Sequence, residues 1–245
     1  MNSALTFRPE WRITLFSLVM VPLMVGLGFW QLARADEKAA LSADFALKQA
    51  RAPFSIESLD GLSVAELAYL PLALEGTFID DRHFLLDNRM REGRFGNEVV
   101  AVFREARSER LFLVNRGWIP ADPARLSRPR VPEVEGPVSI TGYLYVAPDE
   151  PYLLGEQQLE AGWPKQIQAL EVDVLARALG RSGSQLYPHP LRLDALSPGA
   201  LVTDWQVVNQ SPAKHTGYAV QWFSMAGVLA LFWLVRGFRR GDRPG

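Results

Sequence analysis

Two long apolar runs, one near each end of the chain, are the clearest feature of its hydrophobic pattern. Residues 13–32 and 218–235 contain no charged side chain. About 20 apolar residues are enough for a helix to cross the hydrocarbon core of a bilayer. Pro22 lies inside the first run, where neighbouring helices can satisfy the backbone carbonyl that it frees. The pattern predicts two transmembrane helices, at 13–33 and 215–235.

A cleaved signal peptide is the alternative for the first run, because Ala33, Arg34 and Ala35 resemble a cleavage site. The run is longer than the roughly 7–15 apolar residues of a signal peptide, and bulky Trp30 and Gln31 precede the site. A mitochondrial transit peptide also fits poorly, because only 12 residues precede the run. We therefore expect a retained span in the inner membrane of a bacterium.

Basic residues beside the two runs predict how the chain is oriented. The first run has similar basic charge on both sides, so the second decides. One basic residue, Lys214, immediately precedes it, and four arginines follow it: Arg236, Arg239, Arg240 and Arg243. By the positive-inside rule, both termini (1–12 and 236–245) are cytoplasmic and 34–214 is periplasmic.

The region between the runs begins with a predicted helical extension at 33–50, which is rich in helix formers and lacks glycine and proline. It should end before Pro53, since the residue before a proline is pushed away from helical geometry. Beyond it, short β-branched or aromatic segments predict strands. These segments lie at 71–79, 82–88, 97–105, 110–118, 138–146 and 202–209.

The remaining local signals concern turns, loops and one helix. The clearest strand alternation lies in 138–146, whose apolar residues share one face. The polar segment 104–110 predicts a hairpin turn, and 119–137 and 147–166 predict loops. Apolar residues in 171–179 recur at helical spacing and are followed by a glycine, which predicts a helix.

These elements predict a membrane protein in which two transmembrane helices flank a periplasmic, mainly antiparallel β domain. No internal repeat divides 34–214, so we expect one domain of α+β type with a barrel-like sheet. The pattern of short strands separated by turns is typical of such sheets.

Composition excludes several functional classes. The chain has no cysteine and a formal net charge of −1. Absent cysteine removes disulfides, zinc–thiolate sites and covalent haem attachment, and argues against a copper chaperone. A balanced charge offers no basic surface for nucleic acid, so we expect no nucleic-acid partner. The chain also lacks the nucleophile elbow, phosphate-binding loop and metalloprotease motifs, so we expect no enzymatic activity.

Three histidines are present, and they lie far apart in the sequence. His83 is expected to be a surface residue, and His189 lies between two prolines in a loop. No pair has the spacing of a zinc site. His215 differs, because it stands a few residues before the second apolar run.

The start of the second predicted helix would place His215 on an aromatic face. With Ser211 as N-cap and Pro212 in the first turn, His215, Tyr218 and Trp222 share one side of the helix. One interpretation is an interfacial aromatic belt, where Trp and Tyr are enriched. The other is a binding site, and the residues alone leave both open.

The first span ends at the same membrane face with Trp30, Gln31 and Arg34. Gly26, Trp30 and Ala33 would share one side of that helix. Neutral imidazole can bind haem iron, and an arginine fork suits a carboxylate such as a haem propionate. This set of residues indicates a candidate haem site. It is not specific for haem, because ordinary membrane proteins have similar residues at the ends of their spans.

Four motifs, in order over nearly the whole chain, resemble the Surfeit locus protein 1 family of cytochrome c oxidase assembly factors. They are GFWQLARADEK at 28–38, EGTF at 75–78, NRGWIP at 115–120 and HTGYAVQWF at 215–223. The resemblance implies haem a binding, with His215 as axial ligand of the iron, Trp222 in the pocket and Arg34 beside a propionate. It also implies structural roles for Gly76 and Gly117.

Phe223 departs from the family, some members of which have tyrosine there, so a polar contact at this position is in doubt. The resemblance implies an assembly factor that delivers haem a to the oxidase catalytic subunit, with the haem a synthesis enzyme as a further partner. A haem-free membrane scaffold that stabilises an assembly intermediate is the alternative. No nucleophile and base pattern supports a third class, a tethered hydrolase.

Overall fold

The computed structural model describes residues 5–147, 157–181, 185–205 and 210–240. The chain divides into two compact units, which we call the helical unit and the barrel unit. The helical unit consists of 1–44 and 206–245, and the barrel unit consists of 45–205.

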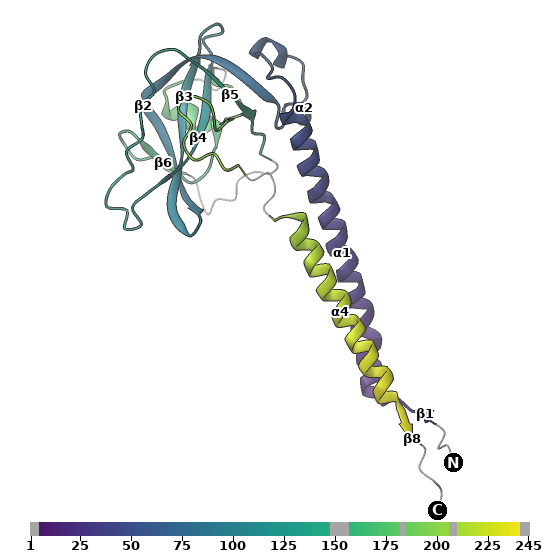
Figure 1. Ribbon diagram of the computed structural model, residues 1–245. Helices are drawn as coiled ribbons and strands as arrows, with labels where there is room; N and C mark the ends of the chain where they lie inside the picture. Colours follow the sequence, from purple (N-terminus) through teal and green to yellow (C-terminus); the bar gives the residue numbers. More distant parts are fainter. Residues whose placement is uncertain (1–4, 148–156, 182–184, 206–209, 241–245) are drawn as a thin grey trace, which may run out of the picture. The chain divides into compact units, whose positions relative to one another are not determined.

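Two long helices lie side by side in the helical unit (Figure 1). Helix α1 covers Trp11–Gln49, so it continues beyond the first apolar run as predicted, and its last residues belong to the barrel unit. Helix α4 covers Pro212–Gly237. Both are long and apolar enough to cross a membrane, so the two predicted spans correspond to two candidate membrane helices.

The helices pack along a seam of small residues. The buried positions are Ser17, Gly28 and Ala35 in α1, and Ala219, Ala226 and Gly237 in α4. Within each helix they are seven or eleven residues apart, a spacing that keeps one stripe facing the neighbouring helix. Small side chains let two membrane helices approach closely.

A short antiparallel ribbon joins the two chain ends of the helical unit. Strand β1, Leu5–Phe7, pairs with strand β8, Phe238–Arg240. The Phe7 ring packs edge-on against Trp233, with centroids 5.5 Å apart. The indole nitrogen of Trp233 donates a hydrogen bond to Oγ1 of Thr14 at 3.0 Å. These contacts fix the alignment of α1 against α4 at this end.

The barrel unit is built on a sheet of six strands, with order β3-β4-β7-β5-β2-β6. Their bounds are β2 Pro71–Arg91, β3 Arg94–Glu105, β4 Leu111–Pro120, β5 Val138–Leu144, β6 Lys165–Ile167 and β7 Leu191–Leu193. Because β2 also pairs with β3, the strands β2, β3, β4, β7 and β5 close into a five-stranded barrel. Most pairs are antiparallel, as predicted, whereas β4–β7 and β2–β6 are parallel.

Among its described residues, the barrel unit also has three short helices: η1 Ile56–Leu59, α2 Val64–Leu67 and α3 Val172–Ala178. Helix α3 confirms the helix predicted at 171–179, and Gly180 follows it with φ +66°, as expected for a glycine that ends a helix. Helix α2 begins with a capping box, in which the side chains of Ser63 and Glu66 each bind the other's backbone N–H.

Two apolar clusters bury both faces of β3 and β4. The first takes residues from all five barrel strands and fills the interior; it includes Leu72, Phe103, Phe112, Ile140 and Leu193. The second lies on the opposite face beneath α3 and includes Phe84, Val102, Leu113 and Leu175. Burial on both faces explains the nearly continuous apolar runs in these two strands.

Two strand predictions need correction. The segments 71–79 and 82–88 are one strand, β2, whose pairing with β3 shifts register between Ile79 and His83. Such an irregularity bends a strand without ending it, so the charged residues between them do not mark a turn. Of the strand predicted at 202–209, Val202 forms only an isolated bridge with Trp118, and 206–209 lie outside the described residues.

The glycines of the two central motifs have structural roles. A Cβ on Gly76 would collide with the backbone oxygen of Arg104 on the paired strand β3. Gly117 has φ +112° and lies where β4 shifts register against Val99 and Val100. The feature at Gly117 is a bulge within β4, in which Arg116 is the extra residue.

Candidate functional site at the helix pair

Helix α4 begins where the sequence predicts. Ser211 occupies the N-cap position in extended conformation and Pro212 follows it, although the Ser211 side chain forms no capping hydrogen bond. His215 therefore lies in the first turn of α4. This position is close to the end of the apolar run, where a polar ring can stay hydrated.

His215 contacts the other helix directly. Its Nδ1 lies 2.8 Å from Oε1 of Gln31 on α1, and the imidazole is half-buried. The ring therefore faces the seam between the helices. Among the described residues, Nε2 forms no hydrogen bond, so that nitrogen is available to a ligand.

The other predicted residues on α4 fall into two groups. Trp222 is half-buried and, with buried Ala219, continues the seam from His215 at spacings of four and three residues. Tyr218 is 43% exposed and lies off the seam. On α4, the histidine and the tryptophan therefore share the inter-helix face, and the tyrosine does not.

Trp30 and Arg34 form a pair on the exposed flank of α1. Trp30 is 51% exposed, and the Arg34 guanidinium lies 5.9 Å from its ring centroid. Arg34 also binds Glu37 at 2.6 Å, one turn further along the helix. The structure brings these two predicted residues together, but it records no direct contact between them and His215.

Near the site, the two helices come into close contact where Gly28 of α1 faces Phe223 of α4. A Cβ on Gly28 would lie 2.6 Å from the Phe223 ring, whereas Gly26 has open space around it. The predicted face of Gly26, Trp30 and Ala33 therefore lies outside the seam. Phe223 fills the space over Gly28 and packs against Phe29 at 5.3 Å, so this position needs no hydroxyl group.

The other two histidines lie in the barrel unit. His83 is half-buried on β2, and His189 packs at 6.2 Å against the edge of Tyr187. Burial lowers the pKa of the His189 imidazole and so favours its neutral form. Among the described residues, no group of three or more His, Asp or Glu side chains could hold a metal ion.

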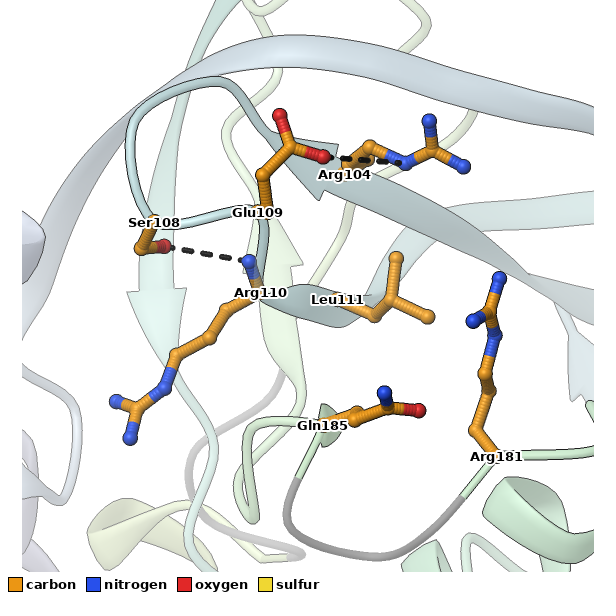
Figure 2. Close-up of a pocket in the computed structure, with 7 residues that line it drawn as sticks. All are labelled: Arg104, Ser108, Glu109, Arg110, Leu111, Arg181 and Gln185. Atoms are coloured by element: carbon orange, nitrogen blue, oxygen red, sulfur yellow. Dashed lines mark hydrogen bonds and ion pairs between the residues drawn. The ribbon is translucent and has the colours of Figure 1, made fainter.

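The barrel unit also has a basic hollow of about 500 Å³ at the β3–β4 hairpin, where the turn confirms the prediction at 104–110 (Figure 2). Its lining includes Arg104, Arg110, Arg181 and Gln185. Glu109 lies 4.0 Å from Arg104 and partly offsets the positive charge. The Ser108 hydroxyl in the lining donates to the Glu105 carboxylate at 2.6 Å, but that carboxylate also accepts the backbone N–H groups of the turn and so serves to hold the hairpin. The hollow is open to solvent, so the helix pair is the better candidate site.

Comparison with known proteins identifies the family. A model of the SURF1 family matches residues 18–227, which include most of both long helices and the whole barrel unit. The chain belongs to the SURF1 family. This confirms the resemblance carried by the four motifs, two of which contain the seam residues of the helix pair.

Individual SURF1 relatives are distant but match over most of their length. A SURF1-like protein of Monosiga brevicollis is 26% identical, over 94% of this chain and 90% of the relative. Surfeit locus protein 1 of Homo sapiens is 23% identical, over 93% of this chain and 78% of the relative. That of Gallus gallus is also 23% identical, over 89% and 73%. The similarity therefore covers the whole architecture.

Proposed function

We propose that this chain is an assembly factor for a haem-copper oxidase, and that it holds haem a at the helix pair before the haem enters the catalytic subunit. The SURF1 family is generally linked to cytochrome c oxidase assembly. The observation that carries the haem part of the proposal is the geometry of His215, whose half-buried ring is held on one nitrogen by Gln31.

The residues present fit a haem. Haem iron accepts a neutral imidazole nitrogen as an axial ligand, and Nε2 of His215 is suited to that role. Trp222 lies about two turns further along the seam and offers a flat apolar surface. The ion pair of Arg34 with Glu37 is exposed, with 46% and 48% of the side chains accessible, so it contributes little and can exchange for a propionate.

The partners follow from this role. The acceptor of the haem would be the catalytic subunit of the oxidase, and its donor would be the enzyme that makes haem a. A haem-free scaffold function would need the same oxidase partner but no ligand at His215, so the state of the histidine separates the two functions.

Loss of haem from a His215→Ala variant tests the proposal. The full chain, co-expressed with haem a synthesis, should purify with haem absorption bands, and His215→Ala should lose most of that absorbance because the iron loses its protein ligand. His189→Ala removes an imidazole from the barrel unit and should keep the bands. Unchanged occupancy and band positions in His215→Ala would exclude the histidine as ligand and favour the scaffold.

We propose further that both termini are cytoplasmic and that the barrel unit lies in the periplasm of a bacterium. The arginines that follow the second apolar run support this orientation. Because the chain has no cysteine, single introduced cysteines report their side of the membrane without background.

Labelling with a membrane-impermeant maleimide measures the orientation. In spheroplasts, Ser127→Cys in an exposed loop of the barrel unit should react at once, because the reagent reaches it from the periplasm. Arg8→Cys, beside strand β1, should react only after the membrane is opened. The reverse pattern of labelling would contradict the proposed orientation.

A further inference from the structure

The hydrogen bond between α1 and α4 at His215 constrains the protonation of the ring. The donor and acceptor atoms, Nδ1 of His215 and Oε1 of Gln31, are 2.8 Å apart, which is the length of a well-formed hydrogen bond. Oε1 of an amide can only accept. With Oε1 of Gln31 facing the ring, as in the structure, the proton of this bond resides on Nδ1.

A neutral imidazole carries one proton. If Nδ1 holds it, Nε2 carries the lone pair and can act as a ligand. We propose that Gln31 is a positioning residue that holds His215 as the Nδ1–H tautomer and turns Nε2 toward the bound ligand. The identity of that ligand as a haem iron rests on the function proposed above, whereas the tautomer does not.

The hydrogen-bond partner of His215 is an amide, and this should affect how strongly the histidine binds its ligand. Many metal-binding histidines donate their second N–H to a carboxylate, which increases the basicity of the ligand nitrogen. Gln31 is a neutral amide, so it attracts the Nδ1 proton less strongly than a carboxylate would. His215 should therefore be a weaker axial ligand than a carboxylate-paired histidine, which suits a protein that must release its haem.

Three variants separate positioning from packing. Gln31→Leu removes the acceptor with little change in volume, and Gln31→Glu retains an acceptor but makes it anionic. Gln221→Leu makes the same change as the first variant at an exposed position of α4, away from the seam, and serves as the matched control.

The first measurement uses haem-free protein. Nitrogen-15 NMR of the imidazoles, in lipid nanodiscs at a pH where His215 is neutral, reports which ring nitrogen is protonated; His215→Ala assigns the signal. The expected result is a protonated Nδ1 in the wild type and in Gln221→Leu, and a mixture of tautomers in Gln31→Leu. A wild-type signal from protonated Nε2, or no change in Gln31→Leu, would overturn the inference.

The second measurement uses haem-loaded protein. Loss of a partner that orients a metal ligand typically weakens binding about 10–100-fold, so Gln31→Leu should bind haem at least about tenfold more weakly. Gln31→Glu should restore affinity and lower the reduction potential, because a more basic imidazole favours ferric iron. A purely structural role of Gln31 would not produce this shift in potential.

The two proposals can fail separately. If the tautomer responds to Gln31 as expected but the wild type takes up no haem, the positioning role stands and the proposed function fails. If haem binds through His215 and neither tautomer nor affinity changes in Gln31→Leu, the function stands and Gln31 has no positioning role.

Discussion

Replacing Gly117 with valine should lower the free energy of unfolding by about 3 kcal/mol, since backbone strain and a steric clash act together. Gly117 has φ +112°, a conformation that β-branched residues avoid. A Cβ there would lie 2.6 Å from the backbone oxygen of Val202. That oxygen accepts the hydrogen bond of the Trp118 N–H at 2.8 Å. It therefore cannot move without breaking the bridge between Trp118 on β4 and Val202.

A second glycine separates the two causes. Gly93 also has positive φ, +74°, but a Cβ there would meet no atom within 4 Å. Gly93→Val should therefore show the cost of strain alone, about 1 kcal/mol. Urea unfolding of the full chain in detergent, followed by circular dichroism, measures both. Equal losses in the two variants would show that the contact with Val202 does not restrict position 117.

Much of the architecture was predictable because its signals are long. The two membrane helices, α3 and the hairpin after β3 each have a complete local pattern of apolar spacing or turn residues. Strands β6 and β7 have three residues each and cannot show alternation. The sequence pattern predicted two strands where the structure has the bent strand β2, because the acidic pair Asp80–Asp81 looks like a turn unless the partner strand is known.

The candidate site was only partly predictable, because it depends on how two helices face each other. Sequence spacing correctly grouped His215 with Trp222, but it placed Gly26 and Trp30 where the structure has Gly28 and Gln31. The sequence pattern pointed to the aromatic residues at the membrane boundary, whereas the seam is set by small residues seven or eleven positions apart. The contact of Gln31 with His215 follows from that seam and has no local signal of its own.

Removing the guanidinium of Arg116 should be nearly as damaging as filling Gly117. Arg116 is 3% exposed, and its Nε and Nη2 donate to the backbone oxygens of Gly199 at 2.7 Å and Pro132 at 2.8 Å. Arg116→Leu would remove the donor from both oxygens, in hydrogen bonds that are partly buried, at about 1.5 kcal/mol each because the donor is charged. We therefore expect a loss of about 3 kcal/mol in the free energy of unfolding of the full chain.

An exposed arginine provides the matched control. Arg128 also donates to a backbone oxygen, that of Pro164 at 2.6 Å, but 43% of its side chain is accessible to water. Arg128→Leu should change stability by no more than about 0.5 kcal/mol, because water can replace its hydrogen bonds. Similar losses in the two variants would contradict the burial argument. Because Pro132 lies in the proline-rich loop, Arg116→Leu should also make that loop more susceptible to protease, which would link the NRGWIP motif to the stability of the barrel unit.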